Sequence, residues 1–515
     1  MLRAHSAAAV RAAEQPLLAA GEGPALMQTA AYGLAMGVAA TLRARGTGLY
    51  GARAVLLAGP GNNGGDTLFA GAWLASRGTR TTALLTSART HPEALAAFVA
   101  AGGRCLALEP GPGRPADPQA AVRLLAEAAA SDVVIDGLLG TGGRGGLRGA
   151  AAEIIAELEL LAGPGRPAVV ACDLPSGIDA TTGEVHAPVL RADLTVTFGA
   201  YKTGLIAAPA EQLCGEVRMV DLGISRFLGP ADTLRLDGAD VAALLPRPGA
   251  RDHKYTRGVT GIIAGSRQYP GAALLAAAAA SACGPGMVRY LGPESVAAAL
   301  HVRNPEVVCS MDGPGEVRVQ SWVAGPGIDG DQHQLQRAGE AMASGLPTVV
   351  DAAALALVEV ERGGANAQLV LTPHAGELAA MLRRHNGGAD RAGIEAAPLT
   401  AARQAADLFG AVVLLKGATT IVAAPGGPVY TQANGSPRLA TAGSGDTLAG
   451  ILGALLAMRG PDPGIGGRPA AFHGLAETAA LAAALHGELS QQDPAAPLDA
   501  GQLAGRIPGV WARLG

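Results

Sequence analysis

Residues 54–76 read A-V-L-L-A-G-P-G-N-N-G-G-D-T-L-F-A-G-A-W-L-A-S. The apolar run Ala54–Ala58 predicts a buried strand, and the stretch Leu68–Ser76 predicts a helix. The turn between them, Gly59–Asp66, can direct backbone N–H groups at an anion where the helix begins. A strand, a glycine-rich turn and a helix in this order are typical of parallel α/β sheets, so this stretch predicts the fold class.

The same alternation continues to about residue 220. Further strands are predicted at Thr82–Leu85, Val133–Ile135, Val169–Ala171, Leu194–Phe198 and Val217–Val220, with a helix at Gln119–Ala130. Near-continuous apolar strands separated by helices indicate a parallel sheet covered on both faces. Glycine- or aspartate-rich motifs follow three of the strands, at Gly59–Asp66, Asp136–Gly146 and Asp173–Asp179. Because ligands bind at the carboxyl ends of such strands, we expect these motifs to converge on one crevice.

A length of 515 residues favours two domains. The stretch Gly223–Arg251 holds three prolines and no long apolar run, so we place the boundary there, giving domains 1–226 and 227–515. The alternation then resumes, with strands predicted at Val259–Ala264, Met287–Leu291, Ser321–Ala324, Thr348–Val350, Gln368–Leu371 and Ala411–Leu415. The loop motifs of this half differ from those of the first, which predicts a second α/β domain and not a repeat.

The composition excludes several classes of protein. Apolar residues make up 49% of the chain and the formal net charge is −4 without long charged runs, which argues against a nucleic-acid partner. No apolar run reaches the ~18 residues of a membrane span, and the N-terminal pattern favours a folded helix over a transit peptide. Five scattered cysteines lack metal-ligand spacing, so we expect reduced thiols and a cytoplasmic protein.

The motifs of the first half carry oxygen-rich side chains. Asn62, Asn63 and Asp66 offer polar groups, while Gly64 and Gly65 let the backbone approach a phosphate. The loop Gly140–Gly146 (Gly140, Thr141, Gly142, Gly143, Arg144, Gly145, Gly146) is rich in N–H groups and suits a pyrophosphate. Asn63, Asp136 and Ser176 together supply hard oxygen ligands for a cation. The alternative is that Asn62 and Asp173 only cap helices and turns, and that Lys202 is a solvated lysine.

The stretches G-N-N-G-G-D, D-G-L-L-G-T-G and D-L-P-S-G-I-D-A resemble the motif loops of the NAD(P)H-hydrate epimerases. The segment Ala25–Gln28 is similar to that family's first helix, and the resemblance spans roughly residues 10 to 225. It implies a Rossmann-like three-layer α/β/α domain with potassium at Asn63, Asp136 and Ser176. It also implies substrate contacts from Asn62 to Asp66, from Gly140 to Gly146 and at Asp173, with Asp173 and Lys202 as the catalytic candidates.

The second half contains a different anion site. The turn Gly443-Ser444-Gly445-Asp446 precedes a predicted helix, Thr447–Met458, whose first N–H groups can face an oxyanion. Lys416-Gly417-Ala418-Thr419-Thr420 follows an apolar strand and suits the phosphates of a nucleotide. Because there is no G-x-x-x-x-G-K-[ST] loop, the chain is not a P-loop NTPase.

A G-x-G-D turn beside a nucleotide-binding strand resembles the ribokinase-like fold, where the aspartate takes a proton from a substrate hydroxyl. Together with H-K, G-S-x-x-Y-x-G-A-A, G-P-G, T-P-H-x-G-E and K-G-x-x-T, the turn resembles the ADP-dependent NAD(P)H-hydrate dehydratases from about residue 245 onward. The resemblance implies that the hydrate contacts Ala272, Gly325, Gly327, His374 and Asp446, with Asp446 as the catalytic base. It implies that ADP contacts Lys416, Gly417, Ala418, Thr419 and Thr420, and that AMP contacts Gly445.

The two resemblances together imply a bifunctional enzyme that repairs hydrated NADH and NADPH. The first domain would interconvert the two epimers, and the second would dehydrate the S epimer with ADP, giving AMP and phosphate. We expect K⁺ in the epimerase domain, Mg²⁺ with ADP in the dehydratase domain, small-molecule partners only and a homo-oligomer. Two alternatives stay open: a ribokinase-like vitamin or sugar kinase, and an N-terminal nucleotide-binding module without catalytic activity.

Overall fold

The structure is a computed structural model that describes residues 1–111, 116–143, 145–161, 163, 165–360, 366–385, 388–459 and 470–515. The chain forms two compact units. The N-terminal unit contains residues 4–232, and the C-terminal unit contains residues 233–515 together with residues 1–3. Each unit holds its own large sheet.

The N-terminal unit is built on a seven-stranded sheet in which every described strand pairing is parallel. Four of the central strands, β3, β2, β5 and β6, are buried along almost their whole length, as their apolar sequences predict. In spatial order the strands are β4 (Arg104–Ala107), β3 (Arg80–Leu85), β2 (Arg53–Ala58), β5 (Val133–Gly137), β6 (Ala168–Cys172), β7 (Leu194–Phe198) and β9 (Glu216–Val220). The six strands predicted for this half are therefore confirmed, and β4 is an addition.

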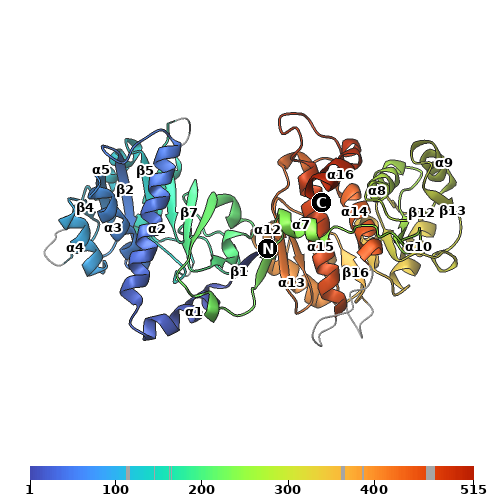
Figure 1. Ribbon diagram of the computed structural model, residues 1–515, viewed down its shortest axis with the longest axis horizontal. Coiled ribbons are helices and arrows are strands. Elements are labelled where there is room, and N and C mark those ends of the chain that lie inside the picture. The colour runs from blue at the N-terminus through green and yellow to red at the C-terminus, as the bar shows by residue number, and fades with distance from the viewer. Residues whose placement is uncertain are drawn as a thin grey trace. The chain divides into compact units, whose positions relative to one another are not determined.

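Helices cover both faces of this sheet. Leu56 of β2 shares a core with residues of α2 (Gly23–Ala44), α3 (Asn62–Ala75) and α4 (Pro92–Ala100). The next residue, Leu57, packs on the other face with α5 (Ala120–Ala129) and α6 (Gly149–Glu159). Figure 1 shows α2 lying against the sheet. The predicted three-layer α/β/α architecture is confirmed.

A short N-terminal helix, α1 (Ala7–Ala19), is fixed beside the last part of this unit. Ser6 caps it, and its side chain accepts a hydrogen bond from the backbone N–H of Ala9. Val10, Ala13 and Leu17 form a buried stripe that packs with Ala200 and Ile224. The residues before it belong to β1 (Leu2–His5), which pairs in parallel with β8 (Tyr201–Lys202). After β8 the chain forms three short 3₁₀ helices, η1 (Thr203–Leu205), η2 (Ala210–Leu213) and η3 (Ser225–Phe227). The folded first helix predicted from the sequence is confirmed.

The helix α2 is, among the described residues, the one helix long and apolar enough to cross a membrane by length and composition. Its apolar side chains include Leu34, Val38 and Leu42, which are buried in the core of the sheet. Core helices of globular domains pass the same test, so α2 is explained by its packing in this unit.

The C-terminal unit has a mixed sheet. The strands from β13 to β17 are parallel, and β18 is antiparallel to both of its neighbours. Their spatial order is β13 (Val308–Ser310), β12 (Met287–Leu291), β11 (Val259–Ile263), β14 (Ser321–Ala324), β15 (Thr348–Val350), β16 (Leu369–Leu371), β17 (Val412–Leu415), β18 (Thr420–Ala423), β19 (Val429–Gln432) and β10 (Thr233–Arg235). The six predicted strands of this half are confirmed.

One face of this sheet shares a large alanine- and leucine-rich core with α7 (Gly238–Leu244), α8 (Pro270–Ala282), α9 (Glu294–Arg303), α14 (Ser444–Arg459), α15 (Ala470–Leu489) and α16 (Ala500–Leu514). Figure 1 shows α14 and α15 in this group, and the two helices contact each other. A Cβ at Gly450 of α14 would lie 2.2 Å from the carbonyl oxygen of Ala276 in α8, so small residues allow this close packing. The other helical segments are η4 (Pro314–Glu316), α10 (Gln332–Met342), η5 (Ala352–Leu357), α11 (Ala375–Arg384), α12 (Arg391–Ala396), α13 (Pro398–Phe409) and η6 (Pro437–Leu439).

The structure corrects where two helices begin. The sequence predicts helices from Leu68 and from Thr447, whereas α3 begins at Asn62 and α14 at Ser444. The glycine-rich motifs therefore form the first turns of the helices instead of preceding them. Glycine disfavours helix interiors, but a Cβ at Gly64 would lie 2.0 Å from the carbonyl oxygen of Gly59. Close backbone packing outweighs helix propensity at this position.

Candidate active sites

A cavity of about 460 Å³ lies in the N-terminal unit where β2, β5 and β6 end. It gathers three predicted motifs, as the carboxyl-end rule for parallel sheets requires. The sequence-predicted residues that line it are Asn62, Asn63, Asp66, Gly140, Thr141, Gly142, Gly143, Asp173 and Lys202. The remaining lining residues are Arg11, Glu14, Leu18, Gly23, Leu26, Met27, Ala30, Pro60, Gly61, Leu138, Leu139, Phe198 and Leu222.

Four predicted contact residues lie outside this lining. Gly64 packs on the backbone of Gly59, and Gly65 faces the ring of His91. Gly146 lies beside His186, and a Cβ on Gly145 would meet no atom within 4 Å. Arg144, the predicted pyrophosphate contact, falls outside the described residues.

Asp173 and Lys202 form a buried ion pair in the cavity wall. The Nζ of Lys202 lies 2.5 Å from Oδ1 of Asp173 and donates a second hydrogen bond to the carbonyl oxygen of Phe198, at 2.8 Å. The other carboxylate oxygen of Asp173 accepts from the backbone N–H of Thr141 at 3.2 Å. Lys202 is only 1% exposed, so the alternative of a solvated lysine is wrong. Asp173 has φ of 68°, a left-handed conformation that aspartate tolerates better than most residues.

Two further carboxyl groups line the same cavity. Asp66 lies in α3, and its Oδ1 is buried without a hydrogen-bond partner in the described part of the chain. Burial raises the pKa of Asp66 well above its ordinary value, and the negative charges of Asp173 and Glu14 add to the effect. Burial also raises the pKa of Glu14 on α1, against the opposing charge of Lys202. The site therefore combines one ion pair with carboxyl groups that favour the neutral form.

An oxygen-rich cluster adjoins the cavity. Ser176 donates to Asp136 twice, from its backbone N–H at 2.8 Å and from its hydroxyl at 2.6 Å. Leu139 joins the cluster to Asn63, because its N–H donates to Ser176 Oγ at 2.9 Å and its carbonyl accepts from Asn63 Nδ2 at 2.9 Å. Burial raises the pKa of Asp136, and the hydrogen bonds from Ser176 oppose that shift. The three predicted cation ligands thus lie in one hydrogen-bonded cluster.

In the C-terminal unit, Asp446 lies in the first turn of α14. Burial and the negative charge of Asp351 raise the pKa of Asp446 to about 6, while the positive charge of Lys416 opposes them. A carboxylate with such a pKa is well suited to act as a general base near neutral pH. The turn before it requires glycine, since Gly443 has φ of 88° and a Cβ there would lie 2.4 Å from Leu275.

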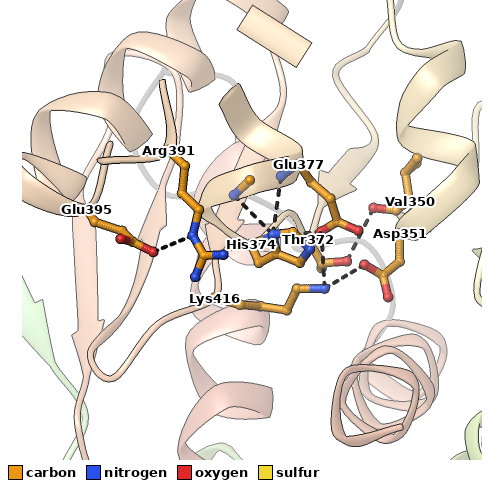
Figure 2. A network of polar contacts seen from close by, with 9 residues as sticks. Val350, Asp351, Thr372, His374, Glu377, Arg391, Glu395 and Lys416 are labelled. Carbon is orange, nitrogen blue, oxygen red and sulfur yellow. Dashed lines mark hydrogen bonds and ion pairs between the residues drawn. The ribbon is translucent and has the colours of Figure 1, made fainter. Parts of the chain in front are cut away.

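Lys416 is held at the carboxyl end of β17 by two carboxylates. Figure 2 shows its Nζ beside Asp351 and Glu377; it lies 2.8 Å from Asp351 Oδ1 and 3.7 Å from Glu377 Oε2. Burial lowers the pKa of Lys416, but the two carboxylates outweigh it and the pKa is raised overall. The lysine stays protonated, and a Cβ at Gly445 would lie 3.5 Å from Nζ. Two predicted nucleotide contacts, Lys416 and Gly445, are therefore neighbours.

The rest of the predicted ADP segment forms the turn between β17 and β18. Gly417 and Ala418 are exposed, whereas Thr419 is buried and Thr420 begins β18. Beside this region, Ser444 Oγ lies 3.2 Å from Nε2 of His486. Burial lowers the pKa of His486 to about 4, so this ring is neutral at physiological pH.

His374 caps α11. Its Nδ1 accepts hydrogen bonds from the N–H groups of Gly376 and Glu377, at 3.0 and 3.2 Å. The Glu377 carboxylate in turn accepts from the His374 backbone N–H at 2.8 Å, which completes a capping box (Figure 2). The ring remains largely exposed and adjoins the Lys416 cluster, so capping and ligand contact are compatible here.

The other predicted hydrate contacts, Gly325, Gly327 and Ala272, lie where segments of the chain approach each other too closely for larger side chains. Gly325 has φ of 120°, and a Cβ there would lie 1.8 Å from the carbonyl oxygen of Asp351. Gly327 has φ of 65°, and a Cβ there would lie 2.6 Å from Cβ of Ala272 in α8. The G-P-G turn therefore lies between the segment that holds Asp351 and the start of α8.

The charged groups of these sites that sequence reasoning missed include Asp351 and Glu14. Asp351 directly follows the strand Thr348–Val350, so the carboxyl-end rule that identified the other motifs could have identified it. Glu14 carries no such signal, because it lies on a helix far from the glycine motifs and reaches the cavity only through tertiary packing.

The structure defines a class of protein with two α/β units. Each unit has charged groups at the carboxyl ends of the parallel strands of its sheet. Residues 23–204 match the family model described as YjeF-related protein N-terminus, and residues 260–506 match the model described as NAD(P)H-hydrate dehydratase. The chain belongs to the family of bifunctional NAD(P)H-hydrate repair enzymes. This membership confirms the resemblances identified in the sequence.

Relatives match over most of their length. The bifunctional NAD(P)H-hydrate repair enzyme Nnr of Mycobacterium tuberculosis (strain CDC 1551 / Oshkosh) is 44% identical over 457 residues, which cover 88% of this chain and 89% of the relative. The protein of that name from Corynebacterium glutamicum is 34% identical over 478 residues, or 78% of each chain. A Bacillus subtilis ADP/ATP-dependent NAD(P)H-hydrate dehydratase, co-crystallised with ATP/Mg²⁺, is 27% identical with a TM-score of 0.46, covering 54% of this chain and 98% of that chain.

Proposed function

We propose that this chain repairs hydrated NADH and NADPH through two activities. Residues 1–226 carry the epimerase, which interconverts the R and S hydrates, and residues 227–515 carry the ADP-dependent dehydratase. The observation that carries the proposal is the pairing of two separate sites: the cavity around Asp173 and Lys202, and the cluster around Asp446 and Lys416. We also propose that the protein is cytoplasmic and forms a homo-oligomer. All five cysteines are free thiols, which fits a reducing compartment.

The dehydratase site suits activation of a poor leaving group. Asp446 would take the proton of the ring hydroxyl, whose oxygen attacks the β-phosphorus of ADP while the bond to AMP breaks. Phosphate then leaves with the electron pair of its C–O bond, and loss of a proton from the neighbouring carbon restores the reduced ring. Lys416 and the first N–H groups of α14 would hold phosphate oxygens. Mg²⁺ on the nucleotide would neutralise phosphate charge, and Asp351 and Glu377 offer the carboxylate oxygens that fit it.

The pH dependence of dehydration should report on Asp446. Since its pKa is raised to about 6, the basic form is lost as the pH falls through 6, so kcat/KM for dehydration should fall there. Lys416 lowers that pKa, so Lys416→Met should move this acid limb to higher pH and raise the KM for ADP. Lys416→Arg, which keeps the charge, should leave the limb near its wild-type position. An unchanged pH profile in Lys416→Met would contradict the assignment of Asp446 as the base.

The cluster of Asn63, Asp136 and Ser176 fits a potassium ion. The Asp136 carboxylate is fully buried and its described partners are neutral donors, so a bound cation would compensate its charge. The side chains of Asn63, Asp136 and Ser176 can coordinate a cation through oxygen atoms, which are the ligands that a hard cation prefers. K⁺ bound there would hold the Leu138–Gly143 loop in its ligand-binding arrangement.

Potassium removal gives a direct test of this cluster. Exchange of K⁺ for a large organic cation should slow epimerisation and leave dehydration of the S hydrate unchanged. Asp136→Ala should do the same and abolish the response to added K⁺. Epimerisation that is indifferent to K⁺ in the wild-type protein would contradict the potassium assignment.

The overall function is tested by incubating the full chain with ADP and each purified hydrate epimer while following the absorbance of the reduced nicotinamide. Both epimers should return to the reduced cofactor, with the R epimer depending on the N-terminal site. A stable phosphorylated product without reduced cofactor would instead support the kinase alternative.

A further inference from the structure

The helix α1 contributes a carboxyl group to the epimerase cavity although it precedes residue 23, where the match to the N-terminal family model begins. Its position is fixed, because Val10, Ala13 and Leu17 pack on the rest of the unit. Glu14 lies next to this buried stripe and is half-buried at the cavity wall.

The carboxyl group of Glu14 has no hydrogen bond or ion pair with any of the described residues. It interacts through space with Lys202, Asp173 and Arg11, and its charge acts on Asp66. Asp66 also has a buried oxygen without a partner, as described above. Unpaired carboxyl groups cost free energy when buried, so two of them in one cavity indicate a use in binding or chemistry.

The reaction assigned to this site needs both a proton donor and a proton acceptor. Water adds to the carbon–carbon double bond of an N-substituted dihydropyridine with its hydroxyl on the carbon bonded to nitrogen. One route to inversion at that carbon breaks the C–O bond, with the ring nitrogen supplying its lone pair to form a C=N⁺ bond. Water must then add to the opposite face and lose a proton.

We propose that Glu14 and Asp66 are the catalytic proton-transfer pair of the epimerase site. In one direction, Asp66 donates a proton to the departing hydroxyl, which leaves as water with the electron pair of the C–O bond. Glu14 accepts the proton of the water that adds to the other face, and the two roles reverse in the opposite direction. The inference rests on the proposed epimerase function and deepens it.

The environments of the two groups support this division. Asp66 is almost fully buried and faces the negative charges of Asp173 and Glu14, which favours a neutral donor. Glu14 is more exposed, and although burial raises its pKa, the positive charges of Lys202 and Arg11 oppose that shift, so its carboxyl gives up a proton more readily than that of Asp66. Groups of the same chemical type held in different environments commonly share acid and base roles in this way.

The test compares Glu14→Gln with the matched control Glu22→Gln; Glu22 is at the N-cap position of α2, makes no side-chain capping hydrogen bond and lies outside the cavity lining. Epimerisation of R and S hydrates is followed over a range of pH, with the uncatalysed exchange subtracted. Glu14→Gln should lower kcat by about 10²–10⁴-fold with little change in KM and remove the acid limb of the pH profile. Glu14→Asp should recover part of kcat, and Glu22→Gln should behave as wild type.

Dehydration of the S hydrate by the same Glu14→Gln preparation shows that the chain is folded. A wild-type kcat in Glu14→Gln, or a raised KM alone, would overturn the proposal while leaving the epimerase function intact. Failure of the wild-type chain to interconvert the epimers would instead overturn the proposed function itself. Loss of kcat together with an unchanged pH profile would also overturn the proton-transfer role.

Discussion

Asp446→Asn is expected to lower ADP-dependent dehydration by about 10²–10⁴-fold, the usual cost of losing a general base. The substitution removes the proton acceptor and keeps the size of the side chain, so the first turn of α14 should stay formed. The affinity for ADP should change little, because Lys416, Thr419 and Gly445 remain in place. Single-turnover dehydration and equilibrium ADP binding, measured on the same preparation, would check both parts.

Epimerisation provides the internal control for this variant. Its proposed groups belong to the N-terminal unit, so its rate should equal that of the wild type. Wild-type dehydration by Asp446→Asn would refute the base assignment. Loss of ADP binding together with activity would show that Asp446 is needed for the structure of the phosphate site.

Lys202→Met is expected to have the largest effect on stability. The substitution leaves the Asp173 carboxylate buried without its charged partner, and breaking a buried pair in this way costs about 3–5 kcal/mol. Epimerisation should be lost as well, because the ion pair lines the cavity. Urea unfolding, monitored through hydrogen exchange in β6 and β7, would measure the change in the free energy of unfolding of the N-terminal unit.

The double variant Lys202→Met with Asp173→Asn separates the two effects. Both partners are then neutral, so much of the lost stability should return, while epimerisation should stay absent. Asparagine also tolerates the left-handed backbone at position 173. A single variant as stable as the wild type would show that water or another group solvates Asp173, which would contradict its buried ion-pair assignment.

The strands were predictable because each is a short apolar run bounded by turn residues, and all twelve predicted runs are strands. The antiparallel strands β18 and β19 were not predicted, and the residues from Lys416 to Thr420, which read as a phosphate loop, form the turn between β17 and β18. Helix starts were predicted too late for a related reason: glycine signals a loop in sequence, whereas here it permits backbone contact.

The candidate sites divide in the same way. Asp173, which directly follows β6, and Asp446, in the glycine turn that begins α14, were identifiable from local sequence. Glu14 was not, because its place at the cavity depends on how α1 packs against Ala200 and Ile224. The link between Asp136 and Ser176 depends similarly on the pairing of β5 with β6.

The helix cap at His374 fixes which ring nitrogen carries the proton. Nδ1 accepts two backbone N–H groups, so the neutral ring must be the Nε2–H tautomer. The ring can therefore offer a ligand only a hydrogen-bond donor, which suits a phosphate or carbonyl oxygen and excludes a role as proton acceptor while the cap persists. The same contacts that begin α11 thereby leave proton abstraction at this site to a carboxylate.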